Sequence, residues 1–187
     1  MNIGFALCGS FCTFSQVIPV IGTLSKQHNV IPIFSEVTYN TDTRFGLAKD
    51  HIESITKICG NQPLHTIAQV EPIGPKKMLD LLVVAPCTGN TLAKLAHSIA
   101  DGPVTMATKS HLRNGRPVLL AISTNDALGG AAENIGKLMG KKHFFFVPFR
   151  QDAPQDKPTS IVADFAMIPA AIDAAEKRTQ IQPMLIN

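Results

Sequence analysis

Five short segments of the sequence are apolar at nearly every position, and this feature restricts the fold more than any other. They are Ile3–Cys8, Val30–Phe34, Leu79–Ala85, Pro117–Ile122 and Phe144–Val147. A strand with one face in water alternates apolar and polar residues, whereas a strand covered on both faces is apolar throughout. The five segments therefore predict a parallel sheet with helices on both faces.

Segments with the apolar spacing of helices separate these strands. We expect them at Ser15–Asn29, Phe45–Ile58, Leu92–Ile99, from about Val104, at Ala131–Met139 and at Ile161–Arg178. Pro19 is expected in a first turn, where proline is tolerated, and Pro169 is expected to kink the last helix. Between residues 61 and 77 we expect a short strand near Leu64 and otherwise irregular chain. This alternation predicts a three-layer, Rossmann-like α/β fold with right-handed crossovers.

The length and composition suit a single domain over residues 1–187. Hydrophobic residues make up 45% of the chain and charged residues 17%, which is typical of a globular protein that buries a core. Residues 151–159 are polar and are expected to form an exposed loop. Residues 160–187 would then form a C-terminal helix and tail.

Charge and hydropathy argue against several classes of partner. The net charge of +3 is scattered along the chain, which gives no support to nucleic-acid binding. No apolar run approaches the roughly 18 residues that a membrane span needs, and no secretion signal precedes the first strand. We therefore expect a cytoplasmic protein without membrane contact.

The cysteine and histidine pattern predicts no metal site. Cys8, Cys12, Cys59 and Cys87 form no CxxC pair, and no histidine stands at ligand spacing from them. In a reducing cytosol these cysteines are expected to be free thiols, with Cys8 and Cys87 acting as small buried apolar residues.

Glycine and hydroxyl side chains follow three of the predicted strands. They are Gly9–Ser10, Thr88–Thr91 and Ser123–Asn125. The carboxyl ends of parallel strands meet at one edge of a sheet, so these turns are expected to lie together. Glycine lets backbone N–H groups approach an anion, hydroxyls donate hydrogen bonds, and helix N-termini add partial positive charge. The pattern indicates a phosphate-bearing cofactor.

Two other interpretations remain open from these residues. Ser, Thr and Asn are also the preferred N-caps of helices, so each turn alone is accounted for by capping. A nicotinamide dinucleotide is the second alternative, because Glu36 stands where a ribose-binding acid would follow the second strand. Gly4 and Gly9, however, do not form the G-x-G-x-x-G pattern of that class of site.

A specific resemblance extends this interpretation. The segment Ala85–Ala96, continued by Ile99–Asp101, resembles the PASANT segment of flavin-dependent cysteine decarboxylases and flavin prenyltransferases, and Leu112–Pro117 resembles the prenyltransferases. The resemblance implies a flavodoxin-like fold and bound FMN, with Asn90 near the isoalloxazine. It assigns cofactor binding to Gly9, Ser10, Ser35, Pro86, Thr88, Gly89, Asn90, Thr91, Thr105 and Ser123.

The chain departs from both of those enzyme groups in its substrate residues. Val70–Pro75 contains no counterpart of the decarboxylases' catalytic histidine, and their substrate motif survives only as Asn125 within Ile122–Gly129. Ser123 stands where the prenyltransferases have an arginine. These departures disfavour cysteine decarboxylation and the binding of a prenyl phosphate.

A narrower resemblance covers nearly the whole chain. Thr41–Gly46, Ile122–Gly129, Val147–Asp152 and Lys157–Pro158 resemble the family of dipicolinate synthase B subunits. The resemblance implies a complex of sporulating bacteria in which a dihydro- or hydroxytetrahydrodipicolinate is aromatised, with NADP on a partner A subunit. The broader resemblance to the flavin-dependent superfamily, whose members form trimers or larger shells, implies a homo-oligomer, a trimer or a multiple of one.

In that reaction, we expect FMN to accept hydride while protein cations hold the substrate carboxylates. Arg44 and Arg150 are the candidates, because the guanidinium fork suits a planar carboxylate; a surface position without function is the alternative for each, and the sequence favours it. Asn125 is the candidate for orienting the substrate and Asp126 a candidate base. The alternatives are an assembly subunit without flavin, and a decarboxylase-like or prenyltransferase-like enzyme.

Overall fold

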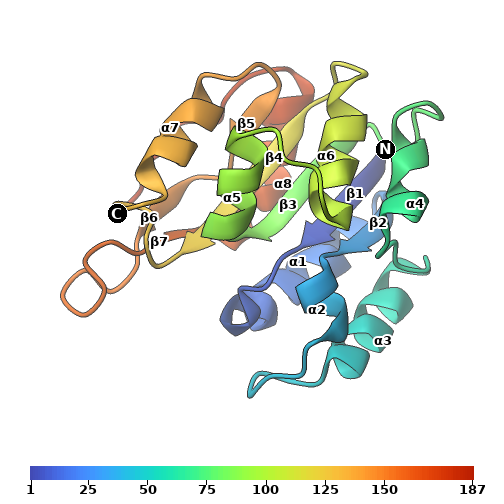
Figure 1. Cartoon of the computed structure of the whole chain (residues 1–187), viewed down its shortest axis with the longest axis horizontal. Coiled ribbons are helices and arrows are strands. Elements are labelled where there is room, and N and C mark those ends of the chain that lie inside the picture. The colour runs from blue at the N-terminus through green and yellow to red at the C-terminus, as the bar shows by residue number, and fades with distance from the viewer.

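A computed structural model describes residues 1–187 and contains one seven-stranded sheet between two layers of helices (Figure 1). The strands are β1 Asn2–Leu7, β2 Asn29–Phe34, β3 Leu81–Cys87, β4 Val118–Thr124, β5 Phe144–Phe146, β6 Phe149–Gln151 and β7 Ile161–Ala163. The first five pair in parallel in the order β2-β1-β3-β4-β5. This is the strand order of flavodoxin-like folds, and it confirms the predicted fold class.

The parallel strands coincide with the apolar segments of the sequence. Every residue of β3 is buried, and in β1 only Asn2 is exposed. These strands lie at the centre of a continuous apolar core of 46 buried residues. Because both faces of the central strands are covered, a polar side chain there would lose its hydration, which explains why the strands are apolar throughout.

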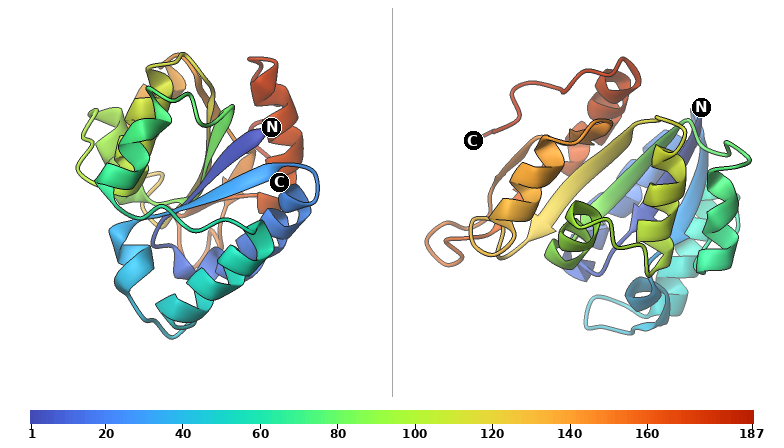
Figure 2. Two further views of the ribbon diagram at one scale, coloured as in Figure 1. Left: turned by 90° about the vertical axis from the view of Figure 1, so that its right-hand side faces the viewer. Right: turned by 45° about the horizontal axis from the view of Figure 1, so that its top comes forward.

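The helices divide between the two faces of the sheet. They are α1 Phe14–Ser25, α2 Glu36–Asn40, α3 Ala48–Cys59, α4 Ile67–Val70, α5 Gly89–Ala96, α6 Pro103–Leu112, α7 Ala132–Met139 and α8 Ile168–Glu176. Helices α1, α3 and α8 cover one face and α4 to α7 the other, as Figure 2 shows when the sheet is seen edge-on. The sequence did not predict α2 or α4, each of which is a single short turn or little more.

The C-terminal part differs from the prediction. Instead of a helix over Ile161–Arg178, Ile161–Ala163 is a strand that pairs antiparallel with both β6 and the end of β4. The Asp164 side chain accepts the Ala166 N–H and begins a new turn, and α8 starts only at Ile168. Pro169 therefore lies in the first turn of α8, where it needs no N–H partner and causes no kink.

A second correction concerns α1. This helix begins at Phe14, so Pro19 lies inside it and not in its first turn. The Pro19 carbonyl, one turn before Thr23, accepts a hydrogen bond from the Thr23 hydroxyl at 3.2 Å. This bond does not replace the one that Pro19 removes, because the missing N–H of Pro19 is the helical partner of the Ser15 carbonyl.

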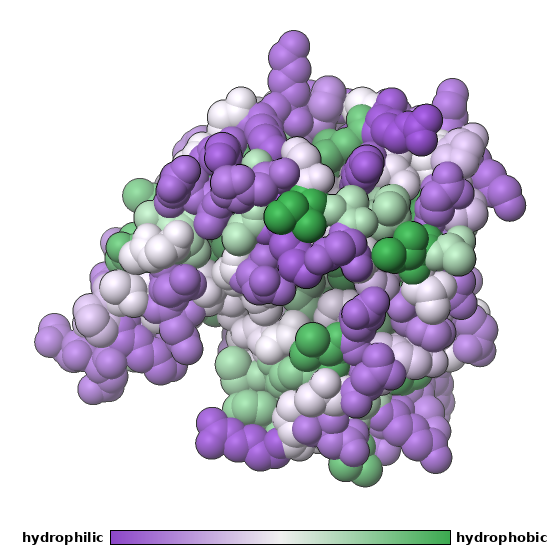
Figure 3. Space-filling view, viewed as in Figure 1, coloured by the Kyte–Doolittle hydropathy of each residue, from purple (hydrophilic) through white to green (hydrophobic).

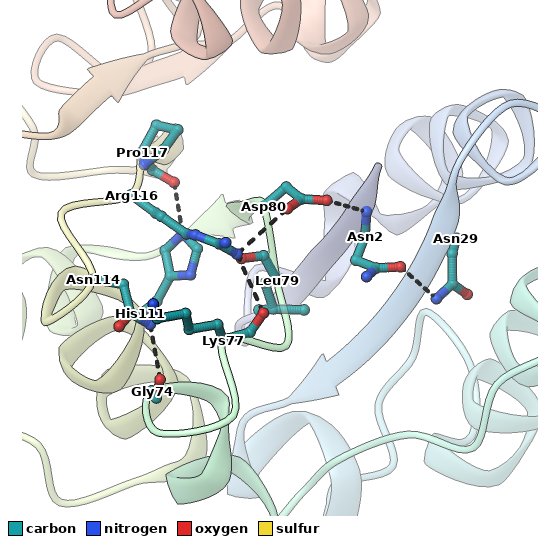
Figure 4. Close-up of polar contacts among 10 residues, drawn as sticks. All are labelled: Asn2, Asn29, Gly74, Lys77, Leu79, Asp80, His111, Asn114, Arg116 and Pro117. Atoms are coloured by element: carbon teal, nitrogen blue, oxygen red, sulfur yellow. Dashed lines mark hydrogen bonds and ion pairs between the residues drawn. The ribbon is translucent and has the colours of Figure 1, made fainter.

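A polar network joins the strands at the amino edge of the sheet (Figure 4). The Asn2 N–H donates to Asp80 Oδ2 at 2.8 Å, and the Arg116 guanidinium lies 3.4 Å from the other oxygen of the same carboxylate. His111 is completely buried, and its Nε2 donates to the Pro117 carbonyl at 3.1 Å. Burial lowers the pKa of His111 to about 4, so this imidazole is neutral in the folded protein at neutral pH.

Candidate functional site

Turns that follow three parallel strands converge at the carboxyl edge of the sheet. The Ser10 hydroxyl after β1 lies 2.8 Å from the Ser123 hydroxyl at the end of β4, although 113 residues separate them in sequence. The Thr91 hydroxyl in α5 donates to the Cys8 sulfur at 3.3 Å. The three segments that the sequence predicted to meet are thus in direct contact.

A cleft of about 400 Å³ opens where the turns after β1, β2 and β3 meet the first turn of α6; we call it the β1–β3 cleft. Six of the residues to which the resemblance assigns cofactor binding line it: Gly9, Ser35, Thr88, Asn90, Thr91 and Thr105. Cys8, Glu36 and the Lys94–Asp101 ion pair, whose N–O distance is 2.9 Å, complete the wall. The Lys94 ammonium, by its hydrogen bond, lowers the pKa of Asp101.

A second cleft of about 500 Å³, which we call the β4 cleft, lies between the turn after β1, the end of β4 and the β6–β7 hairpin. Its predicted residues are Gly9, Ser10, Thr88, Ser123, Asn125 and Arg150. Gly9 and Thr88 belong to both clefts, so the two spaces adjoin at these residues.

The hydroxyls of the β1–β3 cleft also cap helices, as the capping interpretation anticipated. Thr88 Oγ1 accepts the Thr91 N–H at the start of α5, and Ser35 Oγ accepts the Thr38 N–H at the start of α2. Thr105 Oγ1 accepts the Gly102 N–H at the start of α6. The N–H groups of Gly89 and Asn90 in α5, and of Val104 and Thr105 in α6, have no acceptor within their own helices, so the cleft wall retains donors and partial positive charge.

Two glycines allow the close packing of these turns. A Cβ atom at Gly9 would lie 3.3 Å from Val37 Cγ1. A Cβ atom at Gly89 would lie 2.8 Å from Thr124 Oγ1 and 2.9 Å from Asp126 Oδ1, which is closer than side chains approach. Larger residues would push the turns apart, so the shape of this edge depends on glycine at both positions.

Four predicted residues line neither cleft. Pro86 is buried within β3, Gly89 packs against the chain after β4, and Asp126 accepts the Thr124 hydroxyl at 2.6 Å. Arg44 is exposed on the loop between α2 and α3, where its guanidinium lies 4.8 Å from the centre of the Phe45 ring. A tight turn between Thr43 and Gly46 holds this loop, and it does not bring Arg44 beside Arg150.

Arg150 differs from Arg44 in its surroundings. It is exposed on β6, lines the β4 cleft and makes no ion pair. Asn125 lines the same cleft, and its Oδ1, at 3.3 Å, is the nearest of three acceptors that the Ser160 hydroxyl can reach, the others being the Thr124 carbonyl and Asp152 Oδ2. The cleft therefore combines a free cation with an amide whose orientation is partly fixed.

The β6–β7 hairpin is the part of this site that sequence reasoning missed. It supplies Asp152 and Lys157, which pair at 3.1 Å, and Ser160. The polar run at 151–159 indicated an exposed loop, but only Phe149 of β6 is buried, so no apolar segment like that of β5 marks this strand.

The buried thiols beside the clefts are unreactive by environment. Burial raises the pKa of Cys8 to about 11, and burial raises the pKa of Cys87 well above the ordinary value. Both are protonated at neutral pH and lack the thiolate that acts as a nucleophile. No group of three His, Cys, Asp or Glu side chains is placed to hold a metal ion. None of the helices has the length and hydropathy that crossing a bilayer requires.

The model of the flavoprotein family matches residues 1–172 of the sequence. The chain belongs to the flavoprotein family. This flavoprotein is 44% identical to the B subunit of dipicolinate synthase from Bacillus subtilis (strain 168), over all of this chain and 94% of that protein. Its structure matches the crystal structure of the dipicolinate synthase B subunit from Bacillus halodurans C with a TM-score of 0.92 and 43% identity, covering 100% of this chain and 96% of the other.

The fold extends to more distant members of the family. The crystal structure of an FMN-dependent cysteine decarboxylase, SpaF, superposes with a TM-score of 0.71 at 20% identity, covering 95% of this flavoprotein and 96% of that chain. At this level of identity the similarity establishes the shared fold alone. The architecture predicted from the sequence is thus that of the family.

Proposed function

We propose that this flavoprotein is the B subunit of a dipicolinate synthase. In this role it works with an A subunit to remove two hydrogens from a dihydrodipicolinate, or water and two hydrogens from a hydroxytetrahydrodipicolinate, which gives pyridine-2,6-dicarboxylate. The full-length similarity to two dipicolinate synthase B subunits carries the proposal. Two adjoining clefts at the carboxyl edge support it, because the reaction needs room for a cofactor and a substrate side by side.

The residues of the β1–β3 cleft fit FMN. Hydroxyls of Ser35 and Thr88 and the N-termini of α5 and α6 form a donor set of the kind that binds phosphate. The Glu36 carboxylate offers an acceptor for ribityl hydroxyls. Bound FMN would supply a two-electron acceptor. Gly9 would contribute by letting the backbone after β1 approach the group closely.

In the β4 cleft, we assign substrate binding to Arg150 and orientation to Asn125. A guanidinium without an ion pair can take a carboxylate through two parallel hydrogen bonds, with a pre-organised fork. The hydroxyl of Ser160 holds the Asn125 oxygen, which leaves its NH₂ group to donate to the substrate. Asp126 serves this arrangement indirectly, because it accepts the Thr124 hydroxyl beneath the turn.

The assembly that we propose is a cytoplasmic homo-oligomer, a trimer or a multiple of one, that acts during sporulation with an A subunit carrying NADP. Large apolar side chains near the clefts are exposed, among them Val37 at 56% and Leu128 at 53%. Exposed apolar side chains beside a binding site are typical of subunit contacts.

An assembly subunit without flavin is the second candidate. The observation that favours it is that two hydroxyls of the β1–β3 cleft already donate within the protein, Thr91 to the Cys8 sulfur and Thr105 to the Gly102 carbonyl. A decarboxylase-like reaction has less support, because no histidine lines either cleft.

The test is to purify the protein, record its flavin spectrum before and after adding FMN, and measure dipicolinate formation with the A subunit and NADP. Our proposal predicts stoichiometric FMN, co-migration with the A subunit on a sizing column and synthase activity that needs both chains. Synthase activity from a colourless protein that takes up no FMN would instead support the assembly role. Release of carbon dioxide from peptidyl-cysteine substrates would contradict both.

A further inference from the structure

A third cavity, of about 490 Å³, lies away from the two clefts, between the C-terminal ends of α5 and α6 and the segment that joins α7 to β5. We call it the α5–α6 cavity. Its apolar wall is formed by Leu95, Ile99, Leu112 and Phe144. On the face that Figure 3 shows, a small apolar patch over α5 and α6 is surrounded by hydrophilic side chains. The volume falls in the range of roughly 300–1,000 Å³ typical of small-molecule sites.

The charged residues around this cavity are all basic. Lys109, Arg113, Lys141, Lys142 and His143 line it, whereas no Asp or Glu does. None of the four lysine and arginine side chains takes part in an ion pair in the folded chain. Lys109 in the last turn of α6 and Arg113, its C-cap, also lie one helical turn apart, a spacing at which like charges repel.

Helix capping accounts for only part of this charge. Lys141 Nζ donates to the carbonyls of Leu95 and Ala96 at 3.2 and 2.8 Å, and so caps the end of α5. Three helices, α5, α6 and α7, end beside the cavity, and each C-terminus carries about half a negative charge. Together they offset about one and a half of the four formal positive charges. More than two positive charges therefore remain without a partner beside an apolar wall.

We propose that the α5–α6 cavity binds a small organic dianion with an aromatic body, such as an aromatic dicarboxylate. The apolar wall takes the ring, because removing apolar surface from water is favourable. The Arg113 fork and the Lys109 ammonium take the carboxylates. The site is separate from the proposed flavin and substrate clefts, with which it shares only Thr105 of α6.

Isophthalate is the probe, because it has two carboxylates on a flat apolar ring and no catalytic chemistry. Isothermal titration of the full chain is compared with titration of the K109Q/R113Q variant, with amide NMR shifts to locate the ligand. We expect shifts on α6 and at the segment joining α7 to β5, and affinity about tenfold weaker or worse in the variant. R150Q serves to locate the ligand, because heat that persists in R150Q together with shifts on α6 belongs to this cavity. The charge-matched control is K26Q/K49Q, which removes two exposed lysines, one at the end of α1 and one on α3.

Three results would overturn the proposal. One is that R150Q loses binding while K109Q/R113Q keeps it, which would place the ligand in the β4 cleft. Another is equal binding of inorganic phosphate or of neutral isophthalamide, which would remove the need for charge and ring together. The third is no binding by a parent protein with a cooperative thermal transition. The readouts need neither FMN nor the A subunit, and the amide shifts separate binding in this cavity from binding at Arg150 in the β4 cleft, so failure of this inference and failure of the proposed function are distinguishable.

Discussion

The neutral, fully buried His111 makes the stability of the protein depend on pH in a calculable way. Its Nε2 donates to the Pro117 carbonyl at 3.1 Å, and its Nδ1 is buried without a partner. Burial lowers the pKa from 6.5 to about 4 in the folded state. Below about pH 6.5 the unfolded chain therefore binds a proton that the folded chain does not, so stability falls as the pH falls.

The size of the effect follows from the shift. A difference of about 2.5 pKa units corresponds to roughly 3 kcal/mol of unfolding free energy, lost between about pH 6.5 and about pH 4. Below the folded pKa both states are protonated and no further loss arises from this residue. The H111Q variant retains a donor for the Pro117 carbonyl but has no imidazole to titrate. Its unfolding free energy should therefore lack this loss at acidic pH.

Urea unfolding, followed by circular dichroism between about pH 7 and about pH 4, measures the difference between parent and variant. At neutral pH we expect H111Q to be less stable by about 1–2 kcal/mol, because the imidazole packing is lost. As the pH falls, the unfolding free energy of H111Q should rise by roughly 3 kcal/mol relative to that of the parent, so H111Q becomes the more stable of the two. H97Q, which alters an exposed histidine, should follow the parent throughout. A gap between H111Q and the parent that stays constant over this range would refute the reasoning.

Three other predictions test the site. Because burial raises the pKa of Cys8 to about 11, iodoacetamide at mildly alkaline pH should alkylate the exposed Cys12 first, as peptide mass spectrometry would show; prior reaction at Cys8 would contradict its burial. G89A should lower the free energy of chemical unfolding by about 1–3 kcal/mol through overpacking. G22A, whose Cβ would have only one neighbour, at 3.9 Å, should raise it by up to about 1 kcal/mol, and equal effects of the two variants would contradict the close packing at Gly89. R150Q should raise the KM for the dicarboxylate at least about tenfold with FMN retention unchanged, while R44Q should leave the KM as it is; the reverse pattern would reassign the carboxylate site.

The central sheet was predictable because burial leaves a direct mark on sequence. The four longer strands, β1 to β4, are apolar on both faces, so each coincides with its predicted segment to within two residues. The end of α3 was equally clear, because Gly60 takes the left-handed conformation that ends a helix. Local patterns of this kind do not depend on distant parts of the chain.

The C-terminal region was not predictable from the same signals. Ile161–Ala163 resembles the start of a helix in sequence, and its pairing with β4 and β6 decides that it is a strand. Similarly, the sequence gives no reason to separate Arg44 from Arg150, because both are arginines in polar segments. Only the tertiary structure shows that Arg150 lines a cleft and Arg44 does not. The convergence at Ser10 and Ser123, in contrast, followed from topology alone.

The central claim is that the turns after β1 and β3 hold FMN at the carboxyl edge of the sheet. A crystal structure of the protein soaked with FMN tests this directly. We predict that the phosphate and ribityl chain lie in the β1–β3 cleft, within hydrogen-bond distance of Thr88 or Thr91 and beside Gly9. Flavin bound at any other surface, or a carboxyl edge that stays empty at saturating FMN, would contradict the account.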